Sequence, residues 1–331
     1  MSKPSAARHY RGTARNLAFL ARRLRAGDLV AVPTETVYGL AANALDARAC
    51  RKIFAAKGRP TTDPLIVHLH AFAQLAAIAE PNDAARLLAK NFWPGPLTLV
   101  LPKKKIVPAI VSAGLPSVAV RMPSHPLFRR LLKLAGIPLA APSANLFGYV
   151  SPTTARHVHD GLGEKIRHIL DGGPAQIGLE STIVDVRDPA RPRLLRPGAI
   201  TQAELERVLG RSVEISLRRV AGKKEQAQLA PGLLKRHYSP RTPVVLHRTL
   251  PPRPAGGRDE AWVLAAKPAG PVARNIFWLD ARGDLRGAAR QLFATLRRLD
   301  DGRFKKIHVV LATGGGLADA INDRLRRAAA R

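Results

Sequence analysis

Residues 29–40 read LVAVPTETVYGL, an apolar run that ends in hydroxyl and carboxyl side chains. A short apolar run bounded by turn residues is typical of a buried strand, here residues 29–33. Open α/β sheets bind ligands where their strands end. This stretch therefore predicts both a core strand and one wall of a binding site.

Strand and helix patterns alternate from this point up to residue 209. The predicted strands are residues 29–33, 65–69, 97–101, 118–122, 138–141 and 181–186. The predicted helices are residues 47–56, 71–79, 83–91 and 202–209. This mixture favours an α/β fold around a sheet with both parallel and antiparallel pairings.

The alternation of strand and helix patterns stops after residue 210. Residues 216–242 lack sustained periodicity and are typical of a long linker. Beyond the linker, the pattern predicts strands at 244–246, 262–265, 276–279 and 307–311 and helices at 285–299 and 317–330. We therefore expect a first domain over residues 1–212, a linker over 213–242 and a small βαβ-type second domain over 243–331.

The start of the chain has two interpretations. The first acidic residue is Asp28, and the basic, serine-containing segment before it resembles a mitochondrial presequence. Leu17, Leu20 and Leu24, however, recur at helical spacing and lead directly into the first predicted strand. We favour a native first helix.

Composition excludes several classes of protein. The single cysteine, Cys50, cannot form an intramolecular disulfide or a multi-cysteine zinc site, and favours a cytoplasmic protein. No apolar run approaches the roughly 20 residues of a membrane helix, so no membrane partner is expected. The 54 Lys and Arg against 24 Asp and Glu give a net charge of +30. Either a polyanionic partner or a solvated surface explains that charge, and both interpretations stay open.

Several predicted strand and helix ends carry cations. Lys57 and Arg59 follow a predicted helix, where they suit phosphate but also suit the helix dipole. Arg121 within an apolar pattern needs an anion, either a ligand or a carboxylate of the protein itself. His68 in an apolar strand, taken alone, is more typical of a core histidine than of a ligand contact.

Hydroxyl groups gather at the same ends, notably in the segments 34–36, 141–145, 151–153 and 178–185. The chain has no GxxxxGK[ST] loop, HExxH, GxSxG or paired CxxC, which excludes a P-loop ATPase, a zincin and an ordinary α/β-hydrolase. Taken together, the strand ends predict one anion-binding cavity.

Seven ordered motifs in the first domain carry a family resemblance. They are PTETVYGL (33–40), KGRPTTDPL (57–65), FWPGPLT (92–98), VAVRMP (118–123), APSAN (141–145), SPT (151–153) and GLESTIVD (178–185). Towards the end of the chain follow APG (230–232), HYSP (237–240) and GLADAINDRLRRAA (316–329). With these motifs the sequence resembles the YrdC/Sua5 family in its long Sua5 form, over nearly the whole chain.

The resemblance implies an L-threonylcarbamoyladenylate synthase, an enzyme that converts L-threonine, bicarbonate and ATP to threonylcarbamoyl-AMP and pyrophosphate. That product feeds the N6-threonylcarbamoyladenosine (t6A) modification of tRNA through a downstream tRNA threonylcarbamoyl transferase. The implied fold is a twisted, open mixed sheet with a basic cavity, followed by a smaller Rossmann-like α/β domain. Direct contact with tRNA or double-stranded RNA is a further expectation.

The resemblance also implies roles for individual residues. The threonine-binding residues would be Thr36, His68, Arg121, Ala141 and Ser181. The ATP-binding residues would be Arg59, Asp63, Ser117, Ser143, Ser151, Arg196 and Tyr238. Lys57 and Arg59 would be catalytic. A Mg²⁺ ion would accompany ATP, held mostly by phosphate oxygens and water rather than by the protein.

One loop departs from the family pattern. Residues 146–150 read LFGYV, where the family usually has a serine and a proline at the positions of Phe147 and Val150. The hydrogen bonds of this loop are therefore not predicted by the resemblance.

The linker carries Lys235, Arg236, His237 and Tyr238, a cationic and aromatic cluster that suits adenine and phosphates better than a plain spacer would. We therefore predict that the linker is an active-site lid; the alternative is a solvated basic tether.

Two other functions compete with synthesis of the adenylate. A YrdC-like RNA-binding protein without catalysis would explain the net charge but would leave Arg121 and the hydroxyl groups without a role. Carbamoyl transfer in hydrogenase maturation would need zinc-finger regions, which one cysteine cannot supply.

Overall fold

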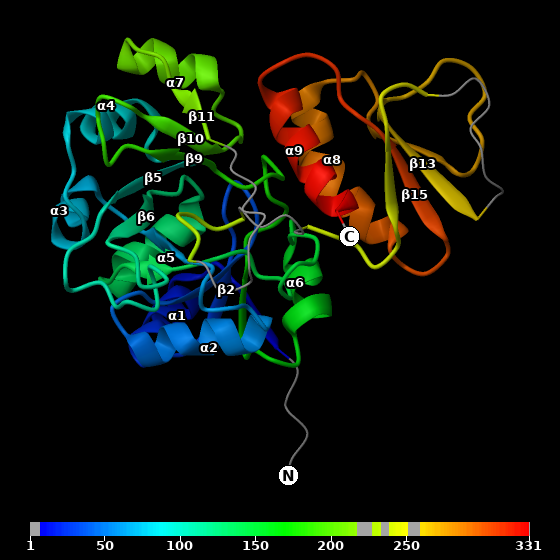
Figure 1. Cartoon of the computed structure of the whole chain (residues 1–331). Coiled ribbons are helices and arrows are strands. Elements are labelled where there is room, and N and C mark those ends of the chain that lie inside the picture. The colour runs from blue at the N-terminus through cyan, green and yellow to red at the C-terminus, as the bar shows by residue number, and fades with distance from the viewer. Residues whose placement is uncertain (1–6, 217–226, 233–237, 251–258, 331) are drawn as a thin grey trace.

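The computed structural model of the chain describes residues 7–216, 227–232, 238–250 and 259–330. Lys235, Arg236 and His237 of the predicted lid lie outside these residues. Figure 1 shows a larger lobe built from the first part of the chain and a smaller lobe built from the last part. No helix in the described part of the chain is long and apolar enough to cross a membrane.

The larger lobe contains an 11-stranded sheet in the order β1-β8-β2-β3-β7-β4-β6-β5-β9-β10-β11. Its strands are β1 (Arg8–Arg11), β2 (Val30–Val32), β3 (Gly39–Asn43), β4 (Ile66–His68), β5 (Leu97–Pro102), β6 (Ser117–Arg121), β7 (Leu139–Ala140), β8 (His168–Asp171), β9 (Thr182–Asp185), β10 (Arg193–Arg196) and β11 (Glu214–Ile215). Strand β6 pairs parallel with β4 and antiparallel with β5. The predicted mixed sheet is confirmed.

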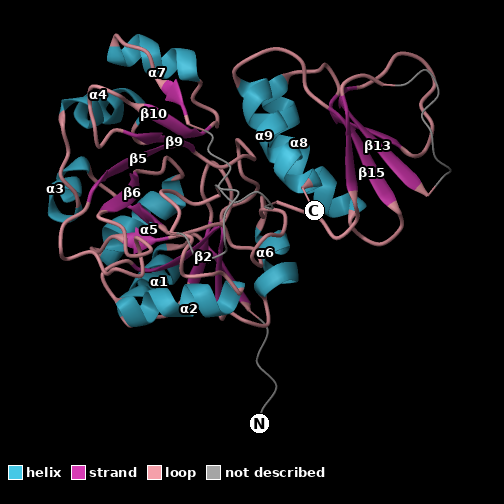
Figure 2. Cartoon of the chain, viewed as in Figure 1, coloured by secondary structure: helices cyan, strands magenta, loops and turns pink. Residues whose placement is uncertain are grey.

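Helices cover this sheet, as Figure 2 shows. They are α1 (Ala14–Arg25), α2 (Ala47–Lys57), the 3₁₀ turn η1 (Phe72–Gln74), α3 (Leu75–Ile78), α4 (Asp83–Phe92), α5 (Pro126–Ala135), α6 (Ala155–Leu162) and α7 (Gln202–Leu209). Thr13 caps α1, whose Leu17, Leu20 and Leu24 are fully buried in a cluster shared with α5. Each such leucine contributes about 1.5–3 kcal/mol by leaving water. The interpretation of this segment as a native helix is therefore confirmed.

Several elements were not predicted, namely β1, β3, β8, β10, β11 and α5. The unpredicted strands have two to five residues, too few for a periodic pattern. Strand β3, GLAAN, also lacks the β-branched and aromatic residues that usually mark a strand. Helix α6 begins after its N-cap Thr154, whose side chain accepts from His157 N.

The smaller lobe contains a parallel four-stranded sheet in the order β12-β15-β13-β14. Its elements are β12 (Val244–His247), β13 (Glu260–Ala266), β14 (Ile276–Asp280), α8 (Leu285–Leu299), β15 (Lys306–Val310) and α9 (Leu317–Ala329). This arrangement matches the predicted βαβ pattern. In Figure 1, α8 and α9 lie between this sheet and the larger lobe.

The two lobes share a hydrophobic cluster. Val37, Val150 and Leu179 of the larger lobe are buried in the same cluster as Leu292 and Phe293 of α8. The predicted division at residues 212 and 242 stays a prediction, although β11 continues the large sheet to Ile215, just past the first boundary. Through this cluster, the second lobe packs directly against the loops of the larger lobe that carry Val37, Val150 and Leu179.

The described part of the linker lies against the large sheet. Leu229 and Ala230 pack with Ile66, Ile183 and Leu195 of strands β4, β9 and β10. Apolar contact of this kind fixes the linker on the sheet, where a solvated tether would have none.

Candidate active site

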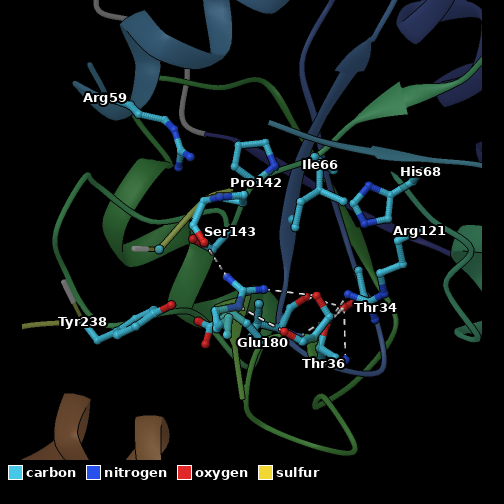
Figure 3. A pocket seen from close by; sticks show the side chains of 17 residues that line it. Thr34, Thr36, Arg59, Ile66, His68, Arg121, Pro142, Ser143, Glu180 and Tyr238 are labelled. Atoms are coloured by element: carbon cyan, nitrogen blue, oxygen red, sulfur yellow. Dashed lines mark hydrogen bonds between the residues drawn. The ribbon is translucent and has the colours of Figure 1, made fainter. Parts of the chain in front are cut away.

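A cavity lies where several strands of the large sheet end, with about 490 Å³ of free space that includes open solvent. Figure 3 shows the side chains around it. Its lining residues are Thr34, Thr36, Val37, Gly39, Arg59, Ile66, His68, Arg121, Ala141, Pro142, Ser143, Glu180, Ser181, Arg196, Pro231, Gly232 and Tyr238. The predicted cavity at the strand ends is therefore present.

Sheet register brings the central pair of side chains together. His68 ends β4 and Arg121 ends β6, and the two residues are direct partners in the parallel pairing of these strands. Thr98 of β5 is the antiparallel partner of Arg121 on the other side. Neighbouring strands thus place an imidazole, a guanidinium and a hydroxyl side by side.

Arg121 is held by three groups of the protein. Its Nε donates to Gly95 O at 3.2 Å, one terminal nitrogen donates to Thr36 Oγ1 at 2.9 Å, and the other pairs with Glu35 Oε1 at 2.6 Å. Of the two anions that the sequence analysis considered for Arg121, the carboxylate of the protein itself is present, and it is Glu35. A guanidinium has five N–H groups, so these three contacts leave two for a ligand in the cavity.

Burial and charge fix the ionisation of this group. Burial acts to raise the pKa of Glu35, but the charge and hydrogen bond of Arg121 outweigh burial and hold that pKa below its usual value. Burial, together with the positive charge of Arg121, lowers the pKa of His68 to about 3. Glu35 is therefore a carboxylate and the His68 ring is neutral at physiological pH.

The loop after β2 presents Thr36 to the cavity in a fixed position. Thr34 Oγ1 accepts from the backbone N–H groups of Thr36 and Val37, both at 3.1 Å, and lies 2.8 Å from Thr36 Oγ1. Such side-chain turns replace the missing strand hydrogen bonds.

A second cation, Arg196, lies across the cavity at the end of β10. Its Nε and one terminal nitrogen donate to Ser181 O at 3.0 Å and Ser181 Oγ at 3.1 Å. The other terminal nitrogen donates to Pro231 O of the linker at 3.2 Å. Ser181 Oγ in turn shares a 2.7 Å hydrogen bond with Thr98 Oγ1. Arg196 therefore connects the site to the linker.

Lys57 and Arg59 diverge at Gly58, whose φ of +63° ends α2 in the left-handed region that favours glycine. Lys57 Nζ points to the backbone, donating to Ser143 O at 2.5 Å and Asn145 O at 2.6 Å. Burial, with the charge of Arg59, lowers the pKa of Lys57 well below its usual value. Lys57 thus holds the loop that carries Ser143, whereas Arg59 itself lines the cavity.

Nine of the predicted site residues line the cavity: Thr36, Arg59, His68, Arg121, Ala141, Ser143, Ser181, Arg196 and Tyr238. Four others are not among its lining residues: Lys57, Asp63, Ser117 and Ser151. Asp63 pairs with Arg59 at 3.0 Å, and Ser151 Oγ donates to Glu180 Oε1 at 2.5 Å. Ser117 is buried at the start of β6, and its Oγ has no hydrogen-bond partner among the described residues.

Two buried carboxylates were not predicted as site residues. Glu35 orients Arg121, and Glu180 lines the cavity itself. Both belong to motifs already quoted, and each lies within two residues of a predicted buried strand, 29–33 for Glu35 and 181–186 for Glu180. That placement was the available signal, since a buried carboxylate needs a cation or a ligand.

Tyr238 closes one side of the cavity from the linker. Its side chain is 1% exposed, and its ring lies 5.5 Å from Phe293 of α8 and 5.4 Å from the Arg324 guanidinium of α9. Gly232 has a φ of +77°, and a Cβ there would lie 2.8 Å from Tyr238 Oη. Linker and second lobe therefore build this wall together.

The divergent loop 146–150 has its own hydrogen bonds. Phe147 N donates to Lys57 O at 2.8 Å, and Tyr149 Oη donates to Asp300 Oδ2 at 2.7 Å. Arg297 of α8 donates to Val150 O at 2.5 Å. The loop thus joins the Lys57 region to the second lobe.

Comparisons with known proteins cover both lobes. The Sua5–YciO–YrdC family model, described as "Telomere recombination", matches residues 22–198, and the model "Threonylcarbamoyl-AMP synthase, C-terminal domain" matches residues 200–330. The chain is 44% identical to a threonylcarbamoyl-AMP synthase of Pyrococcus abyssi, over 92% of this chain and 91% of that protein. It is 40% identical to the Bacillus subtilis protein of the same name, over 95% and 92%.

A solved structure agrees with the sequence matches. The crystal structure of Pyrococcus abyssi Sua5 complexed with L-threonine covers 98% of this chain, and this chain covers 98% of it. The TM-score is 0.86 at 39% sequence identity. The similarity therefore extends to the arrangement of both lobes.

Proposed function

The chain belongs to the Sua5/YrdC family, in the long form that carries a Sua5 C-terminal domain, and from this we propose how its cavity works. Its activity is the synthesis of threonylcarbamoyl-AMP. The substrates and the role of each residue are our proposal. One observation carries it: the five residues proposed for threonine line a single cavity together with Arg59 and Arg196.

We propose that threonine lies at the His68–Arg121 end. The two N–H groups that Arg121 has left suit the threonine carboxylate, because a guanidinium binds a carboxylate with charge-assisted hydrogen bonds. Neutral His68 and the Thr36 hydroxyl offer polar contacts without adding charge. Ala141 is small enough to let the substrate approach the backbone after β7. Ser181 completes this half from the β9 side.

ATP takes the end that Arg59, Ser143 and Arg196 surround in this proposal. Two guanidinium groups face the cavity there, and such groups neutralise phosphate charge. Tyr238 supplies an aromatic face for the adenine. Asp63 holds Arg59 by a buried ion pair, and Ser151 acts through its bond to Glu180. Lys57 donates to the Ser143 carbonyl and so holds the loop that carries Ser143.

The chemistry requires positioning more than covalent participation. The amino group of threonine and bicarbonate form a carbamate with loss of water. A carbamate oxygen then attacks the α-phosphorus of ATP, the bond to the β-phosphate bridge breaks, and pyrophosphate leaves. Holding both reactants in line and neutralising the phosphate charge supplies the acceleration in reactions of this type.

Mg²⁺ would come with ATP. Within the described residues there is no group of three or more His, Cys, Asp or Glu that suits a metal ion, and Glu180 is already bound to Ser151 and Arg324. The residues present therefore do not fit a resident metal cage. Phosphate oxygens and water would hold the ion, and we assign no step to it.

The product would pass to a tRNA-modifying transferase. A mixed anhydride hydrolyses readily, so a cavity covered by the linker protects it from water. The net charge of +30 supports contact with RNA, and a fall of RNA affinity with salt would test this.

Pyrophosphate release tests the function directly. Purified protein with ATP should release pyrophosphate only when threonine and bicarbonate are both present, and labelled carbon from bicarbonate should appear in the adenylate. Arg59→Gln should reduce the rate strongly, whereas Arg86→Gln, an exposed position on α4, serves as the matched control. If ADP and phosphate were the only nucleotide products, the proposal would be wrong.

A further inference from the structure

We propose that Arg324 of α9 is a positioning residue for the ATP half of the cavity, acting across the lobe interface through Glu180 and Tyr238. The inference rests on the proposed function, because it assigns ATP to that half. It gives the second lobe a defined part in catalysis.

The contact between the lobes is short and buried. Arg324 Nε donates to Glu180 Oε2 at 2.8 Å, although 144 residues separate the two along the chain. The Arg324 side chain is fully buried, and that of Glu180 is 8% exposed. A second nitrogen of Arg324 pairs with Asp323 Oδ2 at 2.8 Å. The guanidinium is thus fixed from both lobes.

Glu180 connects Arg324 to the cavity through its two carboxylate oxygens. Its Oε2 takes the hydrogen bond from Arg324 while its Oε1 takes the one from Ser151 Oγ. Glu180 also lines the cavity. One carboxylate therefore joins α9 to a serine proposed for ATP, and its orientation depends on both partners.

Tyr238 is the second target of Arg324. The guanidinium carbon lies 5.4 Å from the centre of the tyrosine ring, within the range of a cation–π contact. The ring of Phe293 lies near the same tyrosine at 5.5 Å. Arg324 therefore supports the aromatic wall proposed for adenine.

Among the described residues, Arg121 in the threonine half has no hydrogen bond or ion pair with the second lobe. Arg121 is held by Gly95, Thr36 and Glu35, all from the larger lobe. Loss of Arg324 should therefore disturb ATP binding selectively, whereas a general loss of folded protein would lower the number of active molecules without changing either KM.

The experiment measures the KM for ATP, the KM for threonine and kcat by pyrophosphate release in the full-length protein. The variants are Arg324→Gln and Arg324→Lys, with Arg326→Gln as matched control, since Arg326 is exposed on the same helix. We expect Arg324→Gln to raise the KM for ATP at least tenfold and to change the KM for threonine less than threefold. Arg324→Lys should be intermediate, because lysine keeps the charge but loses the planar fork. Arg326→Gln should stay within twofold of wild type.

A Ser151→Ala variant tests the route through Glu180. Ser151→Ala alone should raise the KM for ATP. In the double variant with Arg324→Gln, the further rise in the KM for ATP should be smaller than the rise that Ser151→Ala causes alone, because coupled residues are not additive. Full additivity would overturn the route through Glu180.

Unchanged KM values with a lower kcat would show that Arg324 is only structural and would overturn the inference. If Arg324→Gln does not fold, Arg324→Lys decides alone: a rise of threefold or more in the KM for ATP supports positioning, and an unchanged value overturns it. Absence of threonine-dependent pyrophosphate release in the wild-type protein would contradict the proposed function instead, so the two failures are distinguishable.

Discussion

Arg121 shows how one side chain can be structural and still serve a ligand. Its contacts with Glu35 and Thr36 fix the guanidinium plane, and the side chain also lines the cavity. A group already paired with a carboxylate does not reorganise when a second carboxylate arrives. Such preorganisation lowers the cost of binding.

Arg121→Ala is therefore expected to weaken threonine binding more than ATP binding. A charge-assisted contact is worth about 1.5–3 kcal/mol, which corresponds to roughly a 10- to 150-fold rise in the threonine dissociation constant. Calorimetric titration with threonine, and separately with a non-hydrolysable ATP analogue, measures both. Arg130→Ala, exposed on α5, is the control. An unchanged threonine constant with a much weaker ATP constant would place Arg121 in the nucleotide half.

His68 should make stability depend on pH. Its pKa is about 3 in the folded protein, because it is buried beside Arg121, against a usual value of 6.5. Between these values the unfolded chain binds more protons than the folded one, so the free energy of unfolding falls as pH falls below 6.5. The loss from pH 6.5 to pH 5 should be about 1.6 kcal/mol.

Urea unfolding of His68→Gln should show a smaller acid loss than wild type, by about that amount. His9→Gln, at an exposed position in β1, is the control and should follow the wild-type curve. Equal pH slopes for wild type and His68→Gln would contradict a neutral, buried His68.

The linker is the element on which the nucleotide half depends. A Cβ at Gly232 would lie 2.8 Å from Tyr238 Oη and 3.1 Å from a terminal nitrogen of Arg196. Gly232→Ala should therefore displace both side chains and raise the KM for ATP about tenfold, equivalent to 1.4 kcal/mol.

Gly210→Ala separates this displacement from backbone strain. Gly210 has a φ of +64°, close to the +77° of Gly232, but nothing lies within 4 Å of a Cβ there. Both variants carry the strain of a left-handed residue, about 1–2 kcal/mol. Melting temperatures should therefore fall in both, and the KM for ATP should rise only in Gly232→Ala. Equal ATP kinetics in the two would mean that the linker is only a tether.

At the level of elements, the sequence predicted those helices and strands that have a clear pattern of apolar residues. Helix α8 has the predicted bounds, β5 is one residue longer than the predicted strand, and β6 is shifted by one residue at each end. The two-residue strand β11, which was not predicted, exists because β10 offers it hydrogen bonds, a property of the sheet rather than of the two residues. Strand-end reasoning located the cavity because Thr36, His68 and Arg121 lie at or just after the ends of predicted strands.

At the level of the whole molecule, the sequence could not predict what joins the lobes. The contact between Glu180 and Arg324 spans 144 residues, and that between Val150 and Arg297 spans 147. No local pattern marks either pair. The resemblance assigned ATP to Ser151 without the carboxylate through which it meets the second lobe. Long-range packing thus determines how the ATP half is built.

The closeness of this packing can be tested at Gly178, which precedes Leu179 of the shared cluster. A Cβ at Gly178 would lie 2.5 Å from Arg290 Cα and 2.6 Å from Ala289 O of α8. Backbone atoms cannot move aside as side chains do, so Gly178→Ala should push α8 and α9 away from the larger lobe. We expect a larger radius of gyration by small-angle X-ray scattering and at least a tenfold fall in kcat/KM for ATP.

Gly173→Ala is the matched control, because Gly173 lies in the same segment with a φ of +78° against +79° for Gly178, and nothing lies within 4 Å of a Cβ there. The two variants therefore share the strain of a left-handed alanine, about 1–2 kcal/mol, and differ only in the contact with α8. Lower stability in both, with loss of ATP turnover in Gly178→Ala alone, is the expected result. If Gly178→Ala kept the wild-type radius and turnover, close docking of the second lobe would have no part in the reaction, because the ATP half would then form without α8 and α9 in place.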